Sequence, residues 1–218
     1  MDRTFKLLAT ILFFVIFSAC RETSKTEPEQ PKSNHSKETT VKKEQISNKH
    51  VSTGGAYSFE RPKDFGLAVN PQQILVKSVI PPCPEGFDYC LYYNGKKYEN
   101  TNFESAGVGF YVLKSMGEIP CFSVEKYQGR KENLHTETIN GMQFTVFSSG
   151  DAATGHYAND VVYQTFQNGA CYQFVARIGS SQFANYDAGS IEKFDKKMEA
   201  EMRETLKEII RGIQFNSH

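Results

Sequence analysis

One histidine in this chain lies close in sequence to residues that could work with it in catalysis. His156 follows Ser149 and Asp151 and precedes Ser180 and Asp187. A histidine that a carboxylate orients can act as a general base and activate a serine hydroxyl. With Asp151 or Asp187 as the orienting residue and Ser149 or Ser180 as the nucleophile, the pattern describes a small hydrolase. No nucleophile-elbow motif is present, so we assign no catalytic residue and keep the hydrolase as the alternative function.

The same stretch offers polar and aromatic side chains that suit binding. They lie in two predicted loops, residues 150–157 and 179–190. Binding residues concentrate in loops that a rigid scaffold carries. The residues predicted to bind are Asp151, His156, Tyr157, Asn185, Tyr186 and Asp187, with Thr154, Ser180 and Gln182 beside them. The alternative is a pair of ordinary polar loops, in which Asp and Asn satisfy their own backbone.

Metal binding has weaker support in the sequence. Asp151, Asn185 and Asp187 carry oxygen ligands of the kind that calcium prefers, but their spacing is not that of an EF-hand. The cysteines form no Cys-x-x-Cys pair, and no paired histidines accompany them. We therefore predict neither a metal nor a cofactor.

Two Asn-Gly dipeptides, Asn140-Gly141 and Asn168-Gly169, organise the middle of the chain. Asn-Gly favours the type I′ turn, in which both central residues need φ > 0, and alternating apolar and polar residues flank each pair. Four antiparallel strands are therefore predicted between Leu134 and Ile178. Because both turns lie at one end of the sheet, the loops 150–157 and 179–190 must lie at the other.

A two-residue loop at Asn168-Gly169 also predicts which residues face each other. Side chains alternate between the two faces of a strand. The predicted core face consists of Val161, Tyr163, Tyr172, Phe174, Ala176 and Ile178. On the opposite face Asp160 lies across from Arg177, which predicts an ion pair between neighbouring strands.

Shorter strands are expected before this region. They are predicted at residues 56–60, 67–69, 74–80 and 105–113, with a third hairpin at Asn94-Gly95 and a short helix over 122–127. In the strand 105–113, Gly107 and Gly109 indicate a bulge or close packing.

The chain closes with an amphipathic pattern from Ile191 to Ile213, in which apolar residues recur at helical spacing. Ser190 is the predicted N-cap and Gly212 the predicted residue after the helix. Residues 213–215 are expected to add a short edge strand. The predicted fold class is α+β: a single domain with an antiparallel sheet, a meander of hairpins, packed by the long C-terminal helix.

Four of the five cysteines lie in the predicted domain: Cys83, Cys90, Cys121 and Cys171. An even number is typical of a disulfide framework, and four cysteines allow three connectivities. We favour Cys83–Cys90, which are close in sequence across a segment with Pro and Gly, and by elimination Cys121–Cys171. Disulfides of this kind indicate an oxidising compartment.

The first twenty residues are typical of an export signal. Arg3 and Lys6 precede an apolar run over residues 7–17, which is shorter than the about 20 residues of a transmembrane helix. Phe17-Ser18-Ala19-Cys20 looks like a bacterial lipobox, although the lipobox usually has Leu where this chain has Phe17. The resemblance implies that Cys20 carries acyl chains and that the protein is anchored to a membrane. The alternative is an ordinary secretory signal.

The segment after Cys20 is predicted to be a tether. Residues 21–54 are rich in Lys, Glu, Ser and Thr and cannot bury enough apolar surface to offset the entropy of ordering. The globular domain is therefore expected at residues 55–218. If the lipobox reading holds, Arg21 directly after the lipidated cysteine favours the outer membrane.

The order of elements resembles the PsbP/Mog1-like α/β/α sandwich. The resemblance rests on the opening Tyr57-Ser58-Phe59-x-x-Pro62 strand, the central antiparallel sheet, and a terminal amphipathic helix that ends in Ile213-x-Phe215. It covers the chain from Tyr57 to Phe215 and implies a fold. It carries no functional residues, since fold alone does not give function.

These features together favour a non-enzymatic lipoprotein of the cell envelope that acts as a binding or accessory module. Its expected partners are the membrane, through the lipid anchor, and an envelope protein or a small ligand. The net charge is zero and no basic stripe is visible, which argues against nucleic acid. Besides the hydrolase, the alternative is a secreted inhibitor of a cell-wall enzyme.

Overall fold

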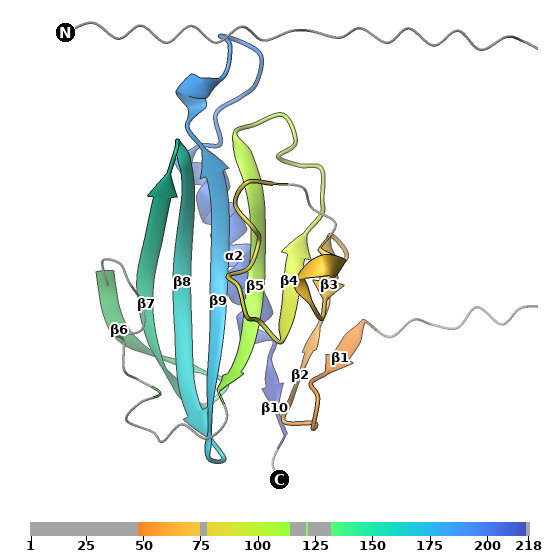
Figure 1. Ribbon diagram of the computed structural model, residues 1–218. Coiled ribbons are helices and arrows are strands. Elements are labelled where there is room, and N and C mark those ends of the chain that lie inside the picture. The colour runs from red at the N-terminus through yellow and green to blue at the C-terminus, as the bar shows by residue number, and fades with distance from the viewer. Residues whose placement is uncertain (1–47, 75–77, 114–120, 122–131, 217–218) are drawn as a thin grey trace, which may run out of the picture. The chain divides into compact units, whose positions relative to one another are not determined.

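The structure is a computed structural model that describes residues 48–74, 78–113, 121 and 132–216, all within one compact unit, residues 45–218. The predicted export signal, the predicted lipidation site Cys20, most of the predicted tether and the helix predicted over 122–127 lie outside the described residues. Strands and helices run in the order β1 Lys49–Val51, β2 Tyr57–Glu60, β3 Phe65–Ala68, η1 Pro71–Gln73, β4 Tyr89–Tyr93, β5 Phe103–Leu113, β6 Glu132–Ile139, β7 Met142–Ala153, β8 His156–Gln167, β9 Ala170–Ser181, η3 Phe183–Asn185, α2 Lys196–Arg211 and β10 Gln214–Phe215 (Figure 1). None of these helices is long and apolar enough to cross a membrane.

Seven strands form one antiparallel sheet in the order β3-β4-β5-β9-β8-β7-β6. The predicted turns are present: Asn140 and Gly141 have φ of 51° and 79°, and Asn168 and Gly169 have φ of 49° and 74°. The predicted register of β8 and β9 is confirmed, with Tyr163 opposite Phe174. A local turn signal therefore placed the longest strands correctly.

Each face of the sheet has its own covering. Helix α2 lies behind the sheet in Figure 1, and its buried residues Met202, Leu206 and Ile210 join the main core against β5 and β9. A segment from Ser78 to Asp88, which we call the strap, crosses in front of β5 and β9. Beneath and around it lies a second buried cluster that includes Tyr111, Val162 and Val175.

The predicted disulfides are both present. The S–S distances are 1.99 Å for Cys83–Cys90 and 2.06 Å for Cys121–Cys171. The first bond joins the strap to β4, and the second joins Cys121 to the start of β9. The fold class predicted from the sequence is therefore confirmed: an antiparallel sheet, one long C-terminal helix, a single domain and two disulfides.

A second, three-stranded sheet was not predicted. Its order is β1-β2-β10, and it brings Lys49–Val51 and Gln214–Phe215 to the two sides of β2. The expected short strand near the C-terminus is thus present. The predicted tether, 21–54, extends too far, because residues 49–51 are a strand whose His50 ring packs on Phe59 and Tyr89.

Two of the shorter predictions are wrong. Asn94-Gly95 forms no two-residue hairpin, since neither residue has positive φ, and β4 pairs instead with β3 and β5. The ring of Tyr93 lies where a Cβ of Gly95 would be, so this glycine allows close packing. In the strand expected at 74–80, Ile74 and Ser78–Ile80 are not strand, and 75–77 lie outside the described residues.

The C-terminal helix is shorter than predicted. It begins at Lys196, and Asp195 is its N-cap, with a side chain that accepts a 2.8 Å hydrogen bond from the Met198 N–H. Ser190, the predicted cap, instead donates to the carbonyl of Asp187. Phe194 fits the helical spacing of apolar residues but lies before the helix begins. It is apolar because it packs against Tyr98 and Phe103.

Candidate functional site at the end of the long hairpin

The predicted loop 150–157 is a two-residue turn between long strands. β7 and β8 continue to Ala153 and His156, and only Thr154 and Gly155 turn the chain, with φ of 50° and 81°. The sequence signal was weak because Thr, unlike Asn, seldom adopts positive φ. β9 likewise continues to Ser181, so the loop predicted at 179–190 spans residues 182–195.

This turn and the loop after β9 form one surface. The Gln182 N–H donates a 2.6 Å hydrogen bond to the Gly155 carbonyl. A Cβ at Gly155 would lie 2.9 Å from the Asn185 amide nitrogen, so the loop packs directly on the glycine. The prediction that the two segments lie together at the end opposite the Asn-Gly turns is correct. We call this surface, made by residues 154–157 and 182–187, the distal end.

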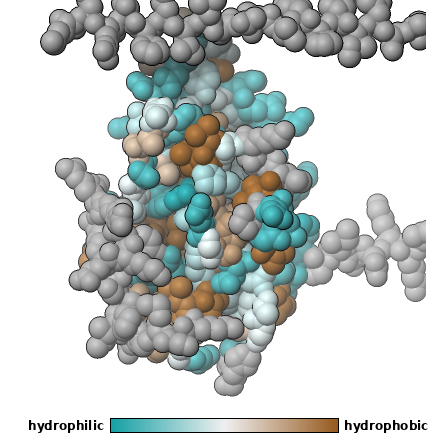
Figure 2. All heavy atoms as spheres, in the orientation of Figure 1, coloured by the Kyte–Doolittle hydropathy of each residue, from teal (hydrophilic) through white to brown (hydrophobic). Residues whose placement is uncertain are grey.

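Three aromatic side chains are unusually exposed at the distal end: Tyr157 at 38% and Phe183 and Tyr186 at 40% each. Tyr186 is fixed, because its hydroxyl hydrogen-bonds to the Ser181 hydroxyl at 2.7 Å. Tyr157 stands opposite Ser180, on the face that α2 covers, whereas His156 and Ser181 point to the strap face. Figure 2 shows the strap face, where hydrophilic residues predominate around the distal end.

His156 has a partner that the sequence did not indicate. Its Nδ1 hydrogen-bonds to a carboxylate oxygen of Glu104, and only 22% and 10% of the two side chains are exposed. The other Glu104 oxygen accepts a 3.1 Å hydrogen bond from the Ile80 N–H in the strap. Glu104 lies at an irregular step of β5, between Phe103 and Ser105, where the register shifts. This one carboxylate therefore ties β5, β8 and the strap together.

Both serines predicted as nucleophiles lie away from His156. Ser149 pairs with Asp160, four residues further along β8, or about 13 Å at the usual rise per residue. Ser180 points to the opposite face of the sheet from His156. Asp151 accepts a hydrogen bond from the Ala152 N–H instead. Among the described residues, His156 forms no hydrogen bond with any serine, so the geometry orients the imidazole without bringing a nucleophile to it.

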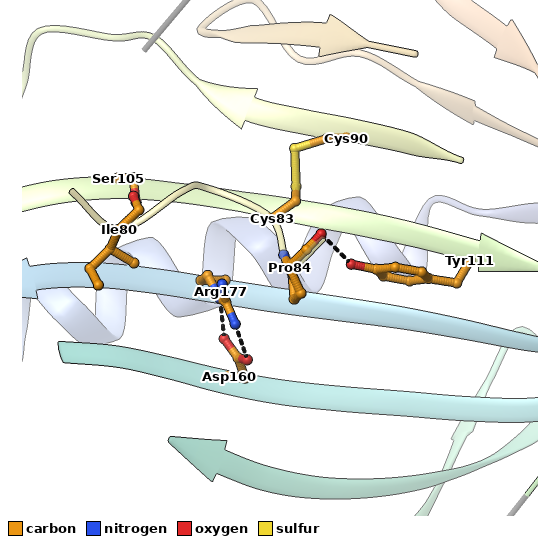
Figure 3. Close-up of a disulfide and its surroundings, with 8 residues drawn as sticks. All are labelled: Ile80, Cys83, Pro84, Cys90, Ser105, Tyr111, Asp160 and Arg177. Atoms are coloured by element: carbon orange, nitrogen blue, oxygen red, sulfur yellow. Dashed lines mark hydrogen bonds and ion pairs between the residues drawn. A yellow bond between two sulfur atoms is a disulfide. The ribbon is translucent and has the colours of Figure 1, made fainter. Parts of the chain in front are cut away.

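Four residues further along β8 lies the ion pair predicted from the register. Arg177 donates two hydrogen bonds of 2.8 Å, from Nε and Nη2, to the two carboxylate oxygens of Asp160. Burial lowers the pKa of Arg177, but the hydrogen bond and charge of Asp160 raise it, and the raised pKa keeps the guanidinium charged. Figure 3 shows the pair beside Pro84 of the strap, with Tyr111 donating to the Pro84 carbonyl at 2.7 Å.

Glycines let the strap approach the sheet so closely. A Cβ at Gly179 would lie 2.7 Å from both Ile80 Cγ2 and the Ser105 hydroxyl. The Ser105 hydroxyl itself donates to the Ile80 carbonyl at 2.6 Å. Ile80 is thus held through its N–H, its carbonyl and its side chain.

Asn102, buried at 6% exposure, organises the other side of the distal end. Its Oδ1 accepts from the Phe194 N–H at 2.7 Å, and its carbonyl accepts from the Ser181 N–H at 2.9 Å. Sequence reasoning missed this residue because its partners are about 80 and 90 positions away. Asn102 fixes both ends of the loop 182–195.

In the part of the chain that the structure describes, no three His, Cys, Asp or Glu side chains lie together in a way that could hold a metal ion. The distal end is therefore built from aromatic rings, amides and one His–Glu pair, a set that suits binding through stacking and hydrogen bonds.

The molecule is thus an antiparallel sheet with a helix on one face and a disulfide-bonded strap on the other. Its structure is similar to that of a protein of Bacteroides thetaiotaomicron (TM-score 0.44, 12% identity, 79% of this chain and 49% of the other), so this chain spans about half of that protein. It is also similar to LpqN, involved in cell envelope biogenesis of Mycobacterium tuberculosis (0.42, 7%, 80% and 88%), and to the Saccharomyces cerevisiae Ran-binding protein Mog1p (0.41, 12%, 78% and 95%).

Mog1p stands among these neighbours, as the predicted resemblance implied, but likenesses this distant carry no argument about function. No protein-family model matches the sequence. No curated protein sequence matches it either.

Proposed function

We propose that this protein is a non-enzymatic binding module of the cell envelope that contacts its partner through the distal end. The proposal rests on one observation: the Thr154-Gly155 turn is hydrogen-bonded to the loop 182–195. The surface that they form together carries the half-exposed rings of Tyr157, Phe183 and Tyr186. Amphipathic aromatic rings on a preorganised surface bind at low entropic cost. Of the residues predicted to bind, His156, Tyr157, Asn185, Tyr186 and Asp187 belong to this end.

The export of the protein is supported by its two disulfides, which form and persist in oxidising compartments. The anchor that we propose is an acylated Cys20, joined to the domain by a spacer that ends at β1. Such an anchor would hold the domain at the envelope and leave the distal end free for an envelope protein or a small ligand.

Site-specific photocrosslinking in living cells would test the binding surface. A benzophenone amino acid is placed at Tyr157, Phe183 or Tyr186, and at Val69 or Val79 as controls, since these valines are also exposed, at 50% and 65%. We expect a discrete adduct from the distal positions and none from the valines. Adducts of equal yield at all five positions, or at the valines alone, would remove the distal end from the proposal.

A separate experiment tests the anchor. In cells fed an alkyne-bearing palmitate, the protein with its native sequence should become labelled. The Cys20→Ala substitution should abolish the label and shift the protein out of the membrane fraction. Labelling that persists in Cys20→Ala would assign the lipid to another residue. A chain that is exported and unlabelled would be an ordinary secreted protein, for which the binding proposal still stands.

A further inference from the structure

The strand β1 is a short edge strand of the three-stranded sheet. It consists of Lys49, His50 and Val51 and pairs, among the described residues, with β2 alone. Lys49 and Val51 are exposed, so His50 is the one residue of β1 that turns toward the domain. Backbone pairs with β2 and the Lys49–Gln214 hydrogen bond also hold β1, but His50 is its side-chain contact with the buried aromatic rings.

The imidazole of His50 closes over two aromatic rings. Its centroid lies 5.0 Å from that of Phe59 on β2 and 4.7 Å from that of Tyr89 on β4. The Nε2 atom is buried and has no hydrogen-bond partner among the residues that the structure describes. If the neutral ring carries its proton on Nδ1, the buried Nε2 is an unpaired acceptor. An unpaired acceptor costs less free energy than an unpaired N–H donor at the same place.

We propose that His50 is an acid-sensitive latch: protonation of its imidazole releases β1 from β2 and uncovers the edge of β2.

Protonation is unfavourable in the closed state for a geometric reason. It would put an N–H donor and a positive charge at Nε2, where the described part of the chain offers no acceptor. The aromatic rings attract a cation but cannot replace the lost hydrogen bond to water. In agreement, burial lowers the pKa of His50 below its usual 6.5. Acid therefore favours the conformation in which the ring reaches water.

The neighbouring groups do not offset this effect. Tyr89 on β4 uses its hydroxyl on the backbone and side chain of Thr53, at 2.7 and 2.6 Å. Tyr57 on β2 stays neutral, because burial first and the charge of Asp88 second raise its pKa. Asp88 itself accepts from the Val112 N–H at 2.7 Å. Lys49 and Glu60 face each other across β1 and β2 on the outer side of the small sheet, away from the imidazole.

Release would create a binding surface that the closed state lacks. It would expose Phe59, now 1% accessible, and Tyr89, now 5% accessible, beside the unpaired backbone of β2. An apolar floor beside a free strand edge is suited to an extended peptide that adds as a new strand.

Hydrogen exchange of the full chain at pH 7.5 and pH 5.0, read by mass spectrometry, tests the latch. Exchange is expressed as protection relative to an unstructured peptide at each pH. We expect peptides within 48–61 to lose protection by about tenfold or more at pH 5.0, while β8 and β9 keep theirs. His50→Phe, which keeps an aromatic ring and cannot titrate, should hold its protection at both values.

His135→Phe is the matched control, because this histidine is exposed on β6 and should leave the acid response intact. If His50→Phe lost protection in β8 and β9, and so did not fold, His50→Leu would take its place as the non-titrating variant. Equal protection of 48–61 at the two pH values would overturn the proposal. So would an acid response that survives in the non-titrating variant.

Discussion

Arg177 and Asp160 face each other across β9 and β8 and share two parallel hydrogen bonds of 2.8 Å under the strap. Their side chains are only 15% and 12% exposed, so water cannot replace either partner. Such a pair is costly to break on one side and much less costly to replace as a whole.

Asp160→Asn should therefore lower the free energy of unfolding by about 2–4 kcal/mol in urea titrations, because a buried guanidinium loses its counter-charge. The double variant Asp160→Leu with Arg177→Met should be more stable than Asp160→Asn. The matched control is Glu201→Gln, which breaks the exposed Lys97–Glu201 pair and should cost less than about 1 kcal/mol. Equal losses of stability in Asp160→Asn and Glu201→Gln would show that the Arg177–Asp160 pair is as solvated as the exposed pair.

Gly179→Ala should loosen the strap. The new methyl would overlap Ile80 and the Ser105 hydroxyl, and relief requires the strap to move, at a cost of about 1–3 kcal/mol. Hydrogen exchange should rise within residues 78–90 before it rises elsewhere. Adding Ile80→Ala should recover part of the stability, whereas Gly150→Ala, whose Cβ would lie 3.3 Å from its nearest neighbour, should cost less.

Substitutions at the observed N-cap, Asp195, and at the predicted N-cap, Ser190, should differ in their effect on stability. Asp195→Ala should destabilise the protein by about 1 kcal/mol, since it removes the acceptor for the Met198 N–H. Ser190→Ala should change little, because Ser190 lies five residues before the helical cap. Chemical denaturation of both variants measures the difference, and the reverse order of costs would place the cap at Ser190.

Alkaline stability should depend on Tyr163. Burial, followed by the charge of Glu137, raises the pKa of Tyr163 to about 12 from the usual 10.0. Between these values the unfolded chain releases a proton that the folded chain keeps, so stability falls as the pH rises from about 10 to 12. Tyr163→Phe should make this fall less steep in urea midpoints at pH 9, 10 and 11, and the part that remains is expected from Tyr57, whose pKa burial also raises. Tyr157→Phe, at an exposed tyrosine, is the control and should leave the slope unchanged.

What could be predicted from the sequence was what local signals determine. Asn168-Gly169 determines a turn, the turn determines the register, and the register places Asp160 opposite Arg177. An even number of cysteines and the short spacing of Cys83 and Cys90 were enough to choose the correct pairing.

What could not be predicted depends on contacts between distant segments. Glu104 meets His156 from 52 positions away, and the strand Lys49–Val51 pairs with β2 while its His50 ring packs on Phe59 and Tyr89. The helix pattern began too early because Phe194 is apolar for reasons of packing outside the helix. Asn102 gives no sequence signal at all, although it fixes both ends of the loop 182–195.

The small sheet also defines how the domain would bear a mechanical load. β1 and β10 lie on the two sides of β2, and both run antiparallel to it. Asn48 lies at the open end of the β1–β2 hairpin, where its carbonyl accepts a 2.9 Å hydrogen bond from the Arg61 N–H. A force that pulls Asn48 away from Arg61 therefore opens the pairs Lys49–Glu60, His50–Phe59 and Val51–Ser58 one after another, in that order. An N-terminal spacer under tension would therefore meet its resistance at these three residue pairs, before any strand of the large sheet carries the force.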